Sequence, residues 1–194
     1  MLYYITSNKQ KVQIAKKYLD PLNVPLEGKH LELTEVQSDD IGLIAKEKAL
    51  QAFAAIQKPL FVNDAGWYIT ALKGFPGPYM KYVNQWLTAK DILDIMAKHD
   101  NREVVFREVV CYIDNEGVKT FVGEIKGNVL TRDTVPSEPL SRSIFSLSPT
   151  NKSIAECWIE GIPSVSNSDI WKDFARWYAS SRHAEKHNDR SVTT

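Results

Sequence analysis

The sequence predicts an α/β domain with a mixed β-sheet, and two observations support that prediction. Apolar runs and helical segments alternate over the first third of the chain in a β-α-β-α-β order, which is typical of strands joined by helical crossovers. Two long apolar-rich segments follow, separated by the turn sequence Asp114-Asn115-Glu116-Gly117, which indicates a hairpin. A sheet that contains both kinds of connection is mixed.

The N-terminal elements follow from apolar runs and from the helix signals between them. Thr6, Ser7 and Asn8 are N-cap residues ahead of a helical pattern that Pro21 ends. The segment HLELTEV alternates as a half-buried strand does. We expect, in order, a strand over 2–5, a helix over 9–19, a strand over 30–36, a helix over 41–57 and a strand over 60–62, with a further extended stretch over 67–72.

The second half of the chain contains a rigid loop, two long strands and a last amphipathic helix. Two Gly and two Pro in Gly74-Phe75-Pro76-Gly77-Pro78 specify a fixed loop. The next helix is expected to break near Thr88. We expect a helix over 79–96, strands over 102–113 and 118–130, an irregular Ser/Pro-rich segment over 136–149 and a helix from Ser168 or Asp169 to about 181.

Composition and charge limit the classes of partner that the protein can have. The chain carries 24 Lys and Arg against 24 Asp and Glu, and this balance argues against a protein that coats nucleic acid or an acidic membrane. No apolar run approaches the ~18 residues of a transmembrane helix. Cys111 and Cys157 form no CxxC motif, and Cys111 is expected as a small buried apolar residue. We expect a cytoplasmic protein, with one domain over 1–182 and a disordered polar tail over 183–194.

The first candidate site runs from Thr6 to Lys11, between the first strand and the first helix. A helix N-terminus presents free backbone N–H groups and the positive end of the helix dipole, and Lys11 lies about one turn in. The Walker A pattern is absent. These features predict a phosphate site of another type; a capped helix with solvated lysines is the alternative.

The second candidate site combines two acidic residues. Asp64 directly follows an apolar strand and precedes Gly66, at the end of the strand where α/β folds place working groups. Glu35 is expected near the end of another strand. Mg²⁺ prefers one or two carboxylates together with substrate phosphates and water, so Asp64 and Glu35 are candidate metal ligands. A turn-forming aspartate and a surface glutamate are the alternatives.

The order of the motifs resembles the inosine triphosphate pyrophosphatase family. The resemblance covers roughly residues 2–180, and the Gly-x-Pro-Gly-x-Tyr loop ending at Tyr79 is its most specific element. The segments that carry it are Asn8-Lys9-Gln10-Lys11, Glu35-Val36-Gln37, the helix with Lys46 and Ala49, Asn63-Asp64-Ala65-Gly66 and Gly74 to Tyr79.

The resemblance implies an elongated, curved mixed sheet flanked by helices, with two lobes and a central cleft. It implies a homodimeric enzyme that uses Mg²⁺ to hydrolyse nucleoside triphosphates to monophosphate and pyrophosphate, acting on no nucleic-acid polymer. The implied catalytic residues are Asp64 and Lys11, and the implied metal ligands are Glu35 and Asp64. The substrate-binding residues expected on this basis are Thr6, Ser7, Asn8, Lys11, Lys46, Asn63 and Tyr79.

Two departures from the family pattern concern charge and the base. The third motif usually has two acidic residues, and here the first is Asn63. Arg142 replaces the aspartate of the family's late base-contacting segment, and Ser166-Asn167-Ser168 replaces Ser-His-Arg. One hypothesis is an active pyrophosphatase with altered base specificity, with candidate base contacts at Arg142, Trp67, Tyr82 or Asn167. Other hypotheses are a weak or inactive nucleotide-binding protein on the same scaffold and an unrelated interaction domain.

Overall fold

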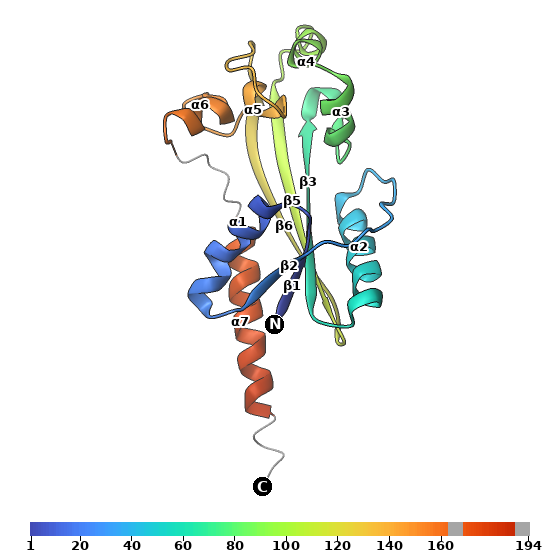
Figure 1. Ribbon diagram of the computed structural model, residues 1–194. Helices are drawn as coiled ribbons and strands as arrows, with labels where there is room; N and C mark the ends of the chain where they lie inside the picture. The colour runs from blue at the N-terminus through green and yellow to red at the C-terminus, as the bar shows by residue number, and fades with distance from the viewer. Residues whose placement is uncertain (163–168, 189–194) are drawn as a thin grey trace.

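The computed structural model describes residues 1–162 and 169–188, with side chains as far as Ser181. The described residues form a seven-stranded mixed sheet in the order β2-β1-β3-β5-β6-β7, with β4 paired to β3 (Figure 1). The strands are β1 (Leu2–Ile5), β2 (Leu26–Lys29), β3 (Leu60–Ile69), β4 (Pro76–Gly77), β5 (Glu103–Asp114), β6 (Gly117–Val129) and β7 (Phe145–Ser146).

Helices cover both faces of this sheet. They are α1 (Lys9–Leu19), α2 (Ile41–Ile56), α3 (Met80–Trp86), α4 (Ala89–Met96), α5 (Ser141–Ile144), α6 (Ile154–Ile159) and α7 (Ile170–Asn188). The side chain of Asp40 caps α2, and Thr88 forms a capping box with Asp91 at the start of α4. The predicted break near Thr88 is therefore confirmed.

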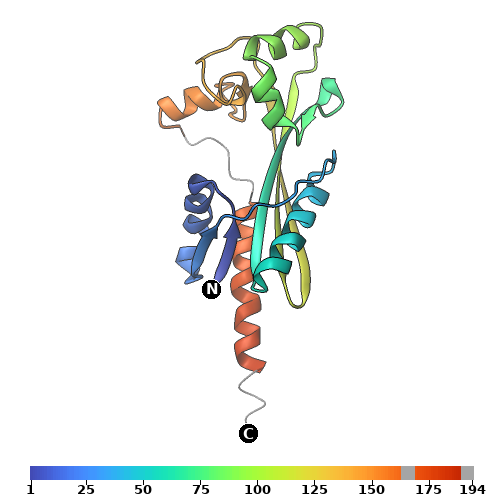
Figure 2. The same ribbon diagram turned by 45° about the vertical axis from the view of Figure 1, so that its right-hand side comes forward.

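Three long strands join two lobes. In Figures 1 and 2, β3, β5 and β6 run from the lobe that contains β1, α1, α2 and α7 to the lobe that contains α3 to α6. In the first lobe, α1 and α7 pack on one face, where Tyr4, Phe61 and Trp171 form the core, and α2 packs on the other over Val62 and Cys111. The second lobe has its own core around Ile69 and Phe145. The expected curved, two-lobed mixed sheet is confirmed.

Strand β3 is paired unevenly, and this positions the site. Strand β5 pairs with it along its whole length, from Leu60 to Ile69. On the other side, β1 pairs with Leu60 and Phe61 only, and β4 pairs with Trp67 and Tyr68 only. Within the described residues, the stretch 62–66 therefore has an unpaired edge between the two lobes. Gly66 is required there, because a Cβ would lie 2.8 Å from the carbonyl oxygen of Gly77.

The prediction of a strand over 30–36 is wrong. The second strand is β2, which begins four residues earlier, at Leu26. Its partner β1 ends at Ile5, opposite Lys29, so the chain beyond Lys29 has no strand to pair with. The alternation is nevertheless physical: Leu31 and Leu33 pack against the α2 side of the core. Gln51 of α2 replaces the missing strand, because its amide bonds both backbone groups of Thr34 at 2.9 and 2.8 Å.

Most other elements match their predictions within one or two residues. Strand β3 does not, because it runs unbroken from Leu60 to Ile69, so Asp64 lies within this strand and not after its end. The segment expected to be irregular over 136–149 contains the short elements α5 and β7. Helix α7 continues to Asn188, past the end expected near 181 and into the segment expected as a disordered tail; residues 189–194 lie outside the described part of the chain. Cys111 and Cys157 are both free and buried. No helix among the described residues is long and apolar enough to span a membrane.

Candidate active site

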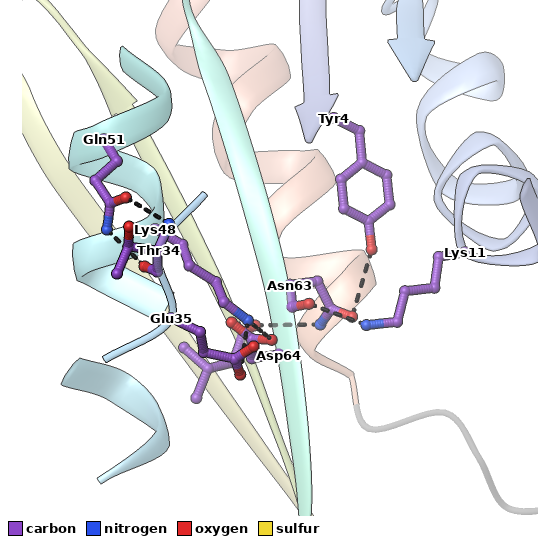
Figure 3. A network of polar contacts seen from close by, with 9 residues as sticks. Tyr4, Lys11, Thr34, Glu35, Lys48, Gln51, Asn63 and Asp64 are labelled. Atoms are coloured by element: carbon purple, nitrogen blue, oxygen red, sulfur yellow. Dashed lines mark hydrogen bonds and ion pairs between the residues drawn. The ribbon is translucent and has the colours of Figure 1, made fainter. Parts of the chain in front are cut away.

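Helix α1 directs one lysine at the unpaired edge of β3. Asn8 caps the helix, because its side-chain oxygen accepts hydrogen bonds from the backbone N–H groups of Gln10 and Lys11 at 2.9 and 3.3 Å. Thr6 Oγ1 in turn accepts from the N–H of Asn8 at 3.1 Å. The predicted cap is confirmed. It fixes the first turn, so that Lys11 Nζ donates to the backbone carbonyl of Asn63 at 3.0 Å (Figure 3).

The half-buried ammonium of Lys11 lies among acidic groups. Burial lowers the pKa of Lys11 from its ordinary value, and the charges of Asp64 and Glu108 partly oppose this effect. A desolvated cation with a fixed position is suited to binding an anion such as a phosphate.

A second lysine lies on the opposite face of β3. Lys48 Nζ of α2 contacts Asp64 Oδ1 at 2.9 Å and Glu35 Oε1 at 3.2 Å, and thereby bridges the two carboxylates (Figure 3). Burial alone would lower the pKa of Lys48, but the charges of Asp64 and Glu35 outweigh it and raise the pKa. Because successive residues of a strand face opposite sides, Asn63 points toward α1 and Asp64 toward α2.

The carboxylate pair fits a Mg²⁺ ion. The second oxygen of Asp64, Oδ2, is buried and has no hydrogen-bond partner among the described residues, and such an orphaned acceptor invites a cation. The described residues contain no group of three or more His, Cys, Asp and Glu side chains arranged for a metal. Two carboxylates completed by phosphate and water oxygens are what Mg²⁺ commonly takes. A Mg²⁺ ion held by Glu35 and Asp64 would need its remaining ligands from phosphate and water oxygens.

Asn63 is held inside the protein. Its side chain is 7% exposed, and its amide nitrogen donates to Glu108 Oε1 at 3.0 Å and to the Val109 carbonyl at 3.1 Å. The hydroxyl of Tyr4 donates to Asn63 Oδ1 at 3.4 Å. Glu108 also accepts from the indole nitrogen of Trp171 at 3.2 Å. Glu108 is not among the residues predicted from the sequence, although an acidic residue within an apolar strand is itself a signal, since such residues are rarely buried without a partner.

An aromatic cleft adjoins this cluster. It has a volume of about 500 Å³ and lies between α1, the sheet and the second lobe. Trp67 and Phe106 pack together on its sheet wall with ring centroids 4.7 Å apart. Glu108 lies in the same wall, between these rings and Asn63. The residues that line the cleft are Ile14, Lys17, Tyr18, Trp67, Phe106, Glu108, Leu147, Ile154, Trp158 and Trp171.

The structure brings together only part of the predicted set. Lys11, Glu35, Asn63 and Asp64 lie around the unpaired edge, and Thr6 and Asn8 form the cap of the helix that carries Lys11. Ser7 is exposed between Thr6 and Asn8. Lys46 does not lie at the edge: it is exposed, and the lysine of α2 that contacts the two carboxylates is Lys48, two residues further along the helix. Tyr79 is 36% exposed ahead of α3, and within the described residues it makes no hydrogen bond or ion pair with these lysines or carboxylates.

Of the residues predicted to contact the base, one lines the cleft and the other described ones do not. Trp67 lines the cleft. Arg142 lies behind its outer wall, where its guanidinium stacks 4.5 Å from the ring of Trp158 and bonds the Glu138 carbonyl. Tyr82 is exposed beside Trp86 in the second lobe. Asn167 lies outside the described residues.

Comparisons with known proteins agree with this fold. The sequence model of the Ham1 family matches residues 2–158. The chain is 30% identical over 183 residues to a dITP/XTP pyrophosphatase of Thermococcus kodakarensis, covering 91% of this chain and 96% of the relative. It is 31% identical over 183 residues to a dITP/XTP pyrophosphatase of Methanopyrus kandleri, covering 90% and 94% of the two chains.

Solved structures show the same architecture at lower sequence identity. The Ham1 protein of Staphylococcus aureus superposes with a TM-score of 0.76 at 17% identity, covering 94% of this chain and 100% of that one. A HAM1 protein of Coxiella burnetii gives 0.76 at 16% identity, covering 95% and 100%. At these identities the likeness shows the fold.

Proposed function

The chain belongs to the Ham1 family, and from this premise we propose that it is a pyrophosphatase that hydrolyses a nucleoside triphosphate to the monophosphate and pyrophosphate. The relatives named dITP/XTP pyrophosphatase support this reaction class at the general level. The observation that carries the proposal is the pair of lysines on opposite faces of β3, Lys11 and Lys48, which meet at its unpaired edge beside two carboxylates.

The phosphates would lie across this edge. Lys11 would hold phosphate oxygens from the α1 side, supported by the N-terminal turn of α1 with Thr6, Ser7 and Asn8. Lys48 would leave its bridge between Asp64 and Glu35 and turn its ammonium to the phosphates. Two cations on opposite sides fix the orientation of the anhydride bond and neutralise the charge that develops on the departing pyrophosphate.

Glu35 and Asp64 would hold Mg²⁺ in this proposal. When bound, the ion neutralises the phosphate oxygens and polarises the phosphorus toward attack. Asp64 is the catalytic carboxylate: its orphaned Oδ2 either binds the ion or accepts the proton of the attacking water. Glu35 is more exposed, with 58% of its side chain accessible, so it can adjust to the ion as it binds.

The nucleoside would occupy the aromatic cleft. Trp67 pairs with Phe106 across β3 and β5, and this pair lies two positions from the pair of Ala65 and Glu108. Both rings are on the sheet face that carries Asn63. The phosphates held at Lys11 therefore point the nucleoside toward these rings, on which a base can stack. The residues that replace the family's base segment support an altered base specificity, because Arg142 stacks on Trp158 behind the wall of the cleft.

A substrate panel tests this function. Purified full-length protein with Mg²⁺ is offered NTPs and dNTPs that include inosine and xanthosine nucleotides, and pyrophosphate and monophosphate are measured. We expect equal amounts of the two products from at least one nucleotide. Failure of a folded protein to turn over any of them would refute the proposal.

The second candidate is a nucleotide-binding protein without turnover. The observation that favours it is that position 63 carries an amide whose hydrogen bonds are all directed into the protein. Calorimetry with a non-hydrolysable triphosphate distinguishes the two candidates. Tight binding without product formation would support this second function.

A homodimer remains part of the proposal. Two tryptophans differ sharply in exposure, since Trp171 is buried in the core and Trp86 is 72% exposed. Trp86 packs on Tyr82 with ring centroids 5.4 Å apart, and these rings offer an unshielded apolar surface on α3. Light scattering should give a dimer for the native chain and a shift toward monomer for Trp86→Ala. A monomeric native chain would contradict it.

A further inference from the structure

Lys48 holds the same two carboxylates that the proposed function assigns to Mg²⁺. Its ammonium lies 2.9 Å from Asp64 Oδ1 and 3.2 Å from Glu35 Oε1 (Figure 3). The side chains of Lys48 and Asp64 are 18% and 20% exposed, so water screens this contact only in part. An ammonium group carries three donors and no acceptor, and it therefore uses the oxygen lone pairs that a metal ion needs.

We propose that Lys48 is an exchangeable counter-ion of the metal site, which makes the binding of Mg²⁺ depend on the triphosphate. Lys48 gives up Asp64 and Glu35 to the ion only when phosphate oxygens receive its ammonium. The inference rests on the proposed function, since it takes the metal site and the triphosphate from it. It also goes beyond a lysine that only holds phosphate, because it requires Lys48 to oppose the binding of Mg²⁺ alone.

The displacement of the ammonium is unfavourable without a phosphate. Among the described residues, the acidic groups that raise the pKa of Lys48 are Asp64 and Glu35 themselves. An ion that takes both carboxylates therefore leaves a largely buried ammonium without its counter-charge, beside a divalent cation that repels it. A triphosphate removes this cost, since its oxygens give the ammonium new partners. The affinities for the ion and for the nucleotide are thus coupled through one side chain.

The local structure lets Lys48 and Glu35 move while Asp64 stays in place. Asp64 belongs to β3, which β5 pairs along its whole length. Lys48 reaches the site from α2 through a flexible four-carbon side chain. Glu35 belongs to no helix or strand, and 58% of its side chain is accessible. The exchange therefore requires two side chains to turn and no helix or strand to shift.

The contacts of Lys11 differ from those of Lys48. The ammonium of Lys11 donates to the backbone carbonyl of Asn63 at 3.0 Å and not to a carboxylate. Lys11 therefore adds positive charge near the site without using the oxygens that the metal needs. Of the two lysines, only Lys48 competes directly with the ion.

The test is the binding of Mg²⁺ alone, without nucleotide, to the full-length protein. Calorimetry gives the dissociation constant, and the rise of the melting temperature with Mg²⁺ checks it. We expect the dissociation constant to fall by about 10-fold in Lys48→Met. It should stay near the native value in Lys48→Arg, which keeps a positive charge with donors for both carboxylates. Adding Asp64→Asn to Lys48→Met should abolish the gain, because the ion then lacks a ligand.

Lys46→Met is the matched control, because it removes the same charge from an exposed position two residues away on α2. This variant should bind Mg²⁺ as the native chain does. An unchanged or weaker affinity in Lys48→Met would overturn the inference. Equal gains in Lys48→Met and Lys46→Met would overturn it too, since they would reflect net charge alone.

Lys48→Gln covers the case in which Lys48→Met does not fold. Its amide can still donate to a carboxylate but carries no charge, so Mg²⁺ alone should again bind about 10-fold more tightly. Native affinity in this variant would overturn the inference.

The substrate panel separates failure of the inference from failure of the proposed function. Native Mg²⁺ affinity in the Lys48 variants, with a nucleotide still hydrolysed by the native chain, refutes the inference alone. Tighter binding of Mg²⁺ without hydrolysis of any nucleotide keeps the exchange of Lys48 for the ion and refutes the pyrophosphatase. Neither tighter binding nor hydrolysis refutes both.

Discussion

Lys11 Nζ donates to the backbone carbonyl of Asn63 at 3.0 Å, so the first turn of α1 is joined to the part of β3 that no strand pairs on that side in the described structure. A carbonyl at such an edge would otherwise face solvent. The contact holds the ammonium where a bound phosphate can replace the carbonyl as its partner. The site is thus assembled from a gap in the sheet and two helices that flank it.

The first prediction separates Lys48 from Lys46. Lys48→Met should lower kcat/KM by roughly 100-fold, since it removes a cation that binds developing phosphate charge. Lys46→Met should stay within about twofold of native, as expected for an exposed lysine. Steady-state kinetics on both variants check this. Equal losses, or a loss confined to Lys46→Met, would contradict the assignment.

The second prediction concerns Asp64. Asp64→Asn keeps an oxygen for Lys48 but removes the charge at Oδ2, and kcat should fall by about 10³-fold. Circular dichroism should show an unchanged fold. Asp94→Asn, which alters a surface partner of Lys90, is the control and should keep native turnover. Native turnover in Asp64→Asn would remove this carboxylate from the mechanism.

The third prediction is a pH dependence. Because burial lowers the pKa of Lys11, its ammonium is lost, as pH rises, earlier than that of an ordinary lysine. The pKa of Lys48 is raised, so Lys48 keeps its charge over the same range. The alkaline decline in kcat/KM should therefore follow Lys11. In Lys11→Arg the decline should move to higher pH; identical profiles would assign it to another group.

The fourth prediction tests the contact between Asn63 and Glu108. Asn63→Asp places two carboxylates against each other, which raises the pKa of one of them in the folded state. The stability lost should be largest at neutral pH, roughly 1–3 kcal/mol, and should shrink as pH falls and one carboxyl is protonated.

Urea unfolding at two pH values measures this. Asn101→Asp is the control, because Asn101 is exposed and its side-chain oxygen can still accept from the N–H of Glu103. That variant should show little change at either pH. A loss in Asn63→Asp that is independent of pH would indicate damaged packing and not charge repulsion.

The fold was largely predictable because its signals are local. Capping residues mark α2 and α4, and the turn after Asp114 marks the β5–β6 hairpin. The misplaced second strand shows the limit. The alternation of apolar and polar residues over 30–36 indicates an extended, half-buried segment. Which residues pair with a neighbouring strand depends on the length of β1, which ends at Ile5. That length is a property of the pairing, which a single sequence does not display.

The site was predictable in kind and less so in detail. Lys48 could have been chosen over Lys46 from the phase of α2, since it shares a helical row with the buried Ile44 and Ala52, four residues away on either side. Glu108 could have been noticed as an acid in an apolar strand. Strand geometry alone predicts that the side chains of Asn63 and Asp64 point to opposite faces of the sheet. Only the tertiary structure shows that groups from both faces come together at the same edge of β3.

The measurement that tests the central claim most directly is the identity of the products formed from inosine triphosphate with Mg²⁺. The account predicts one pyrophosphate for each inosine monophosphate, abolished in Asp64→Asn and retained in Asp94→Asn. Release of orthophosphate with inosine diphosphate, or equal rates in the two variants, would contradict a pyrophosphatase built around Lys11, Lys48 and Asp64.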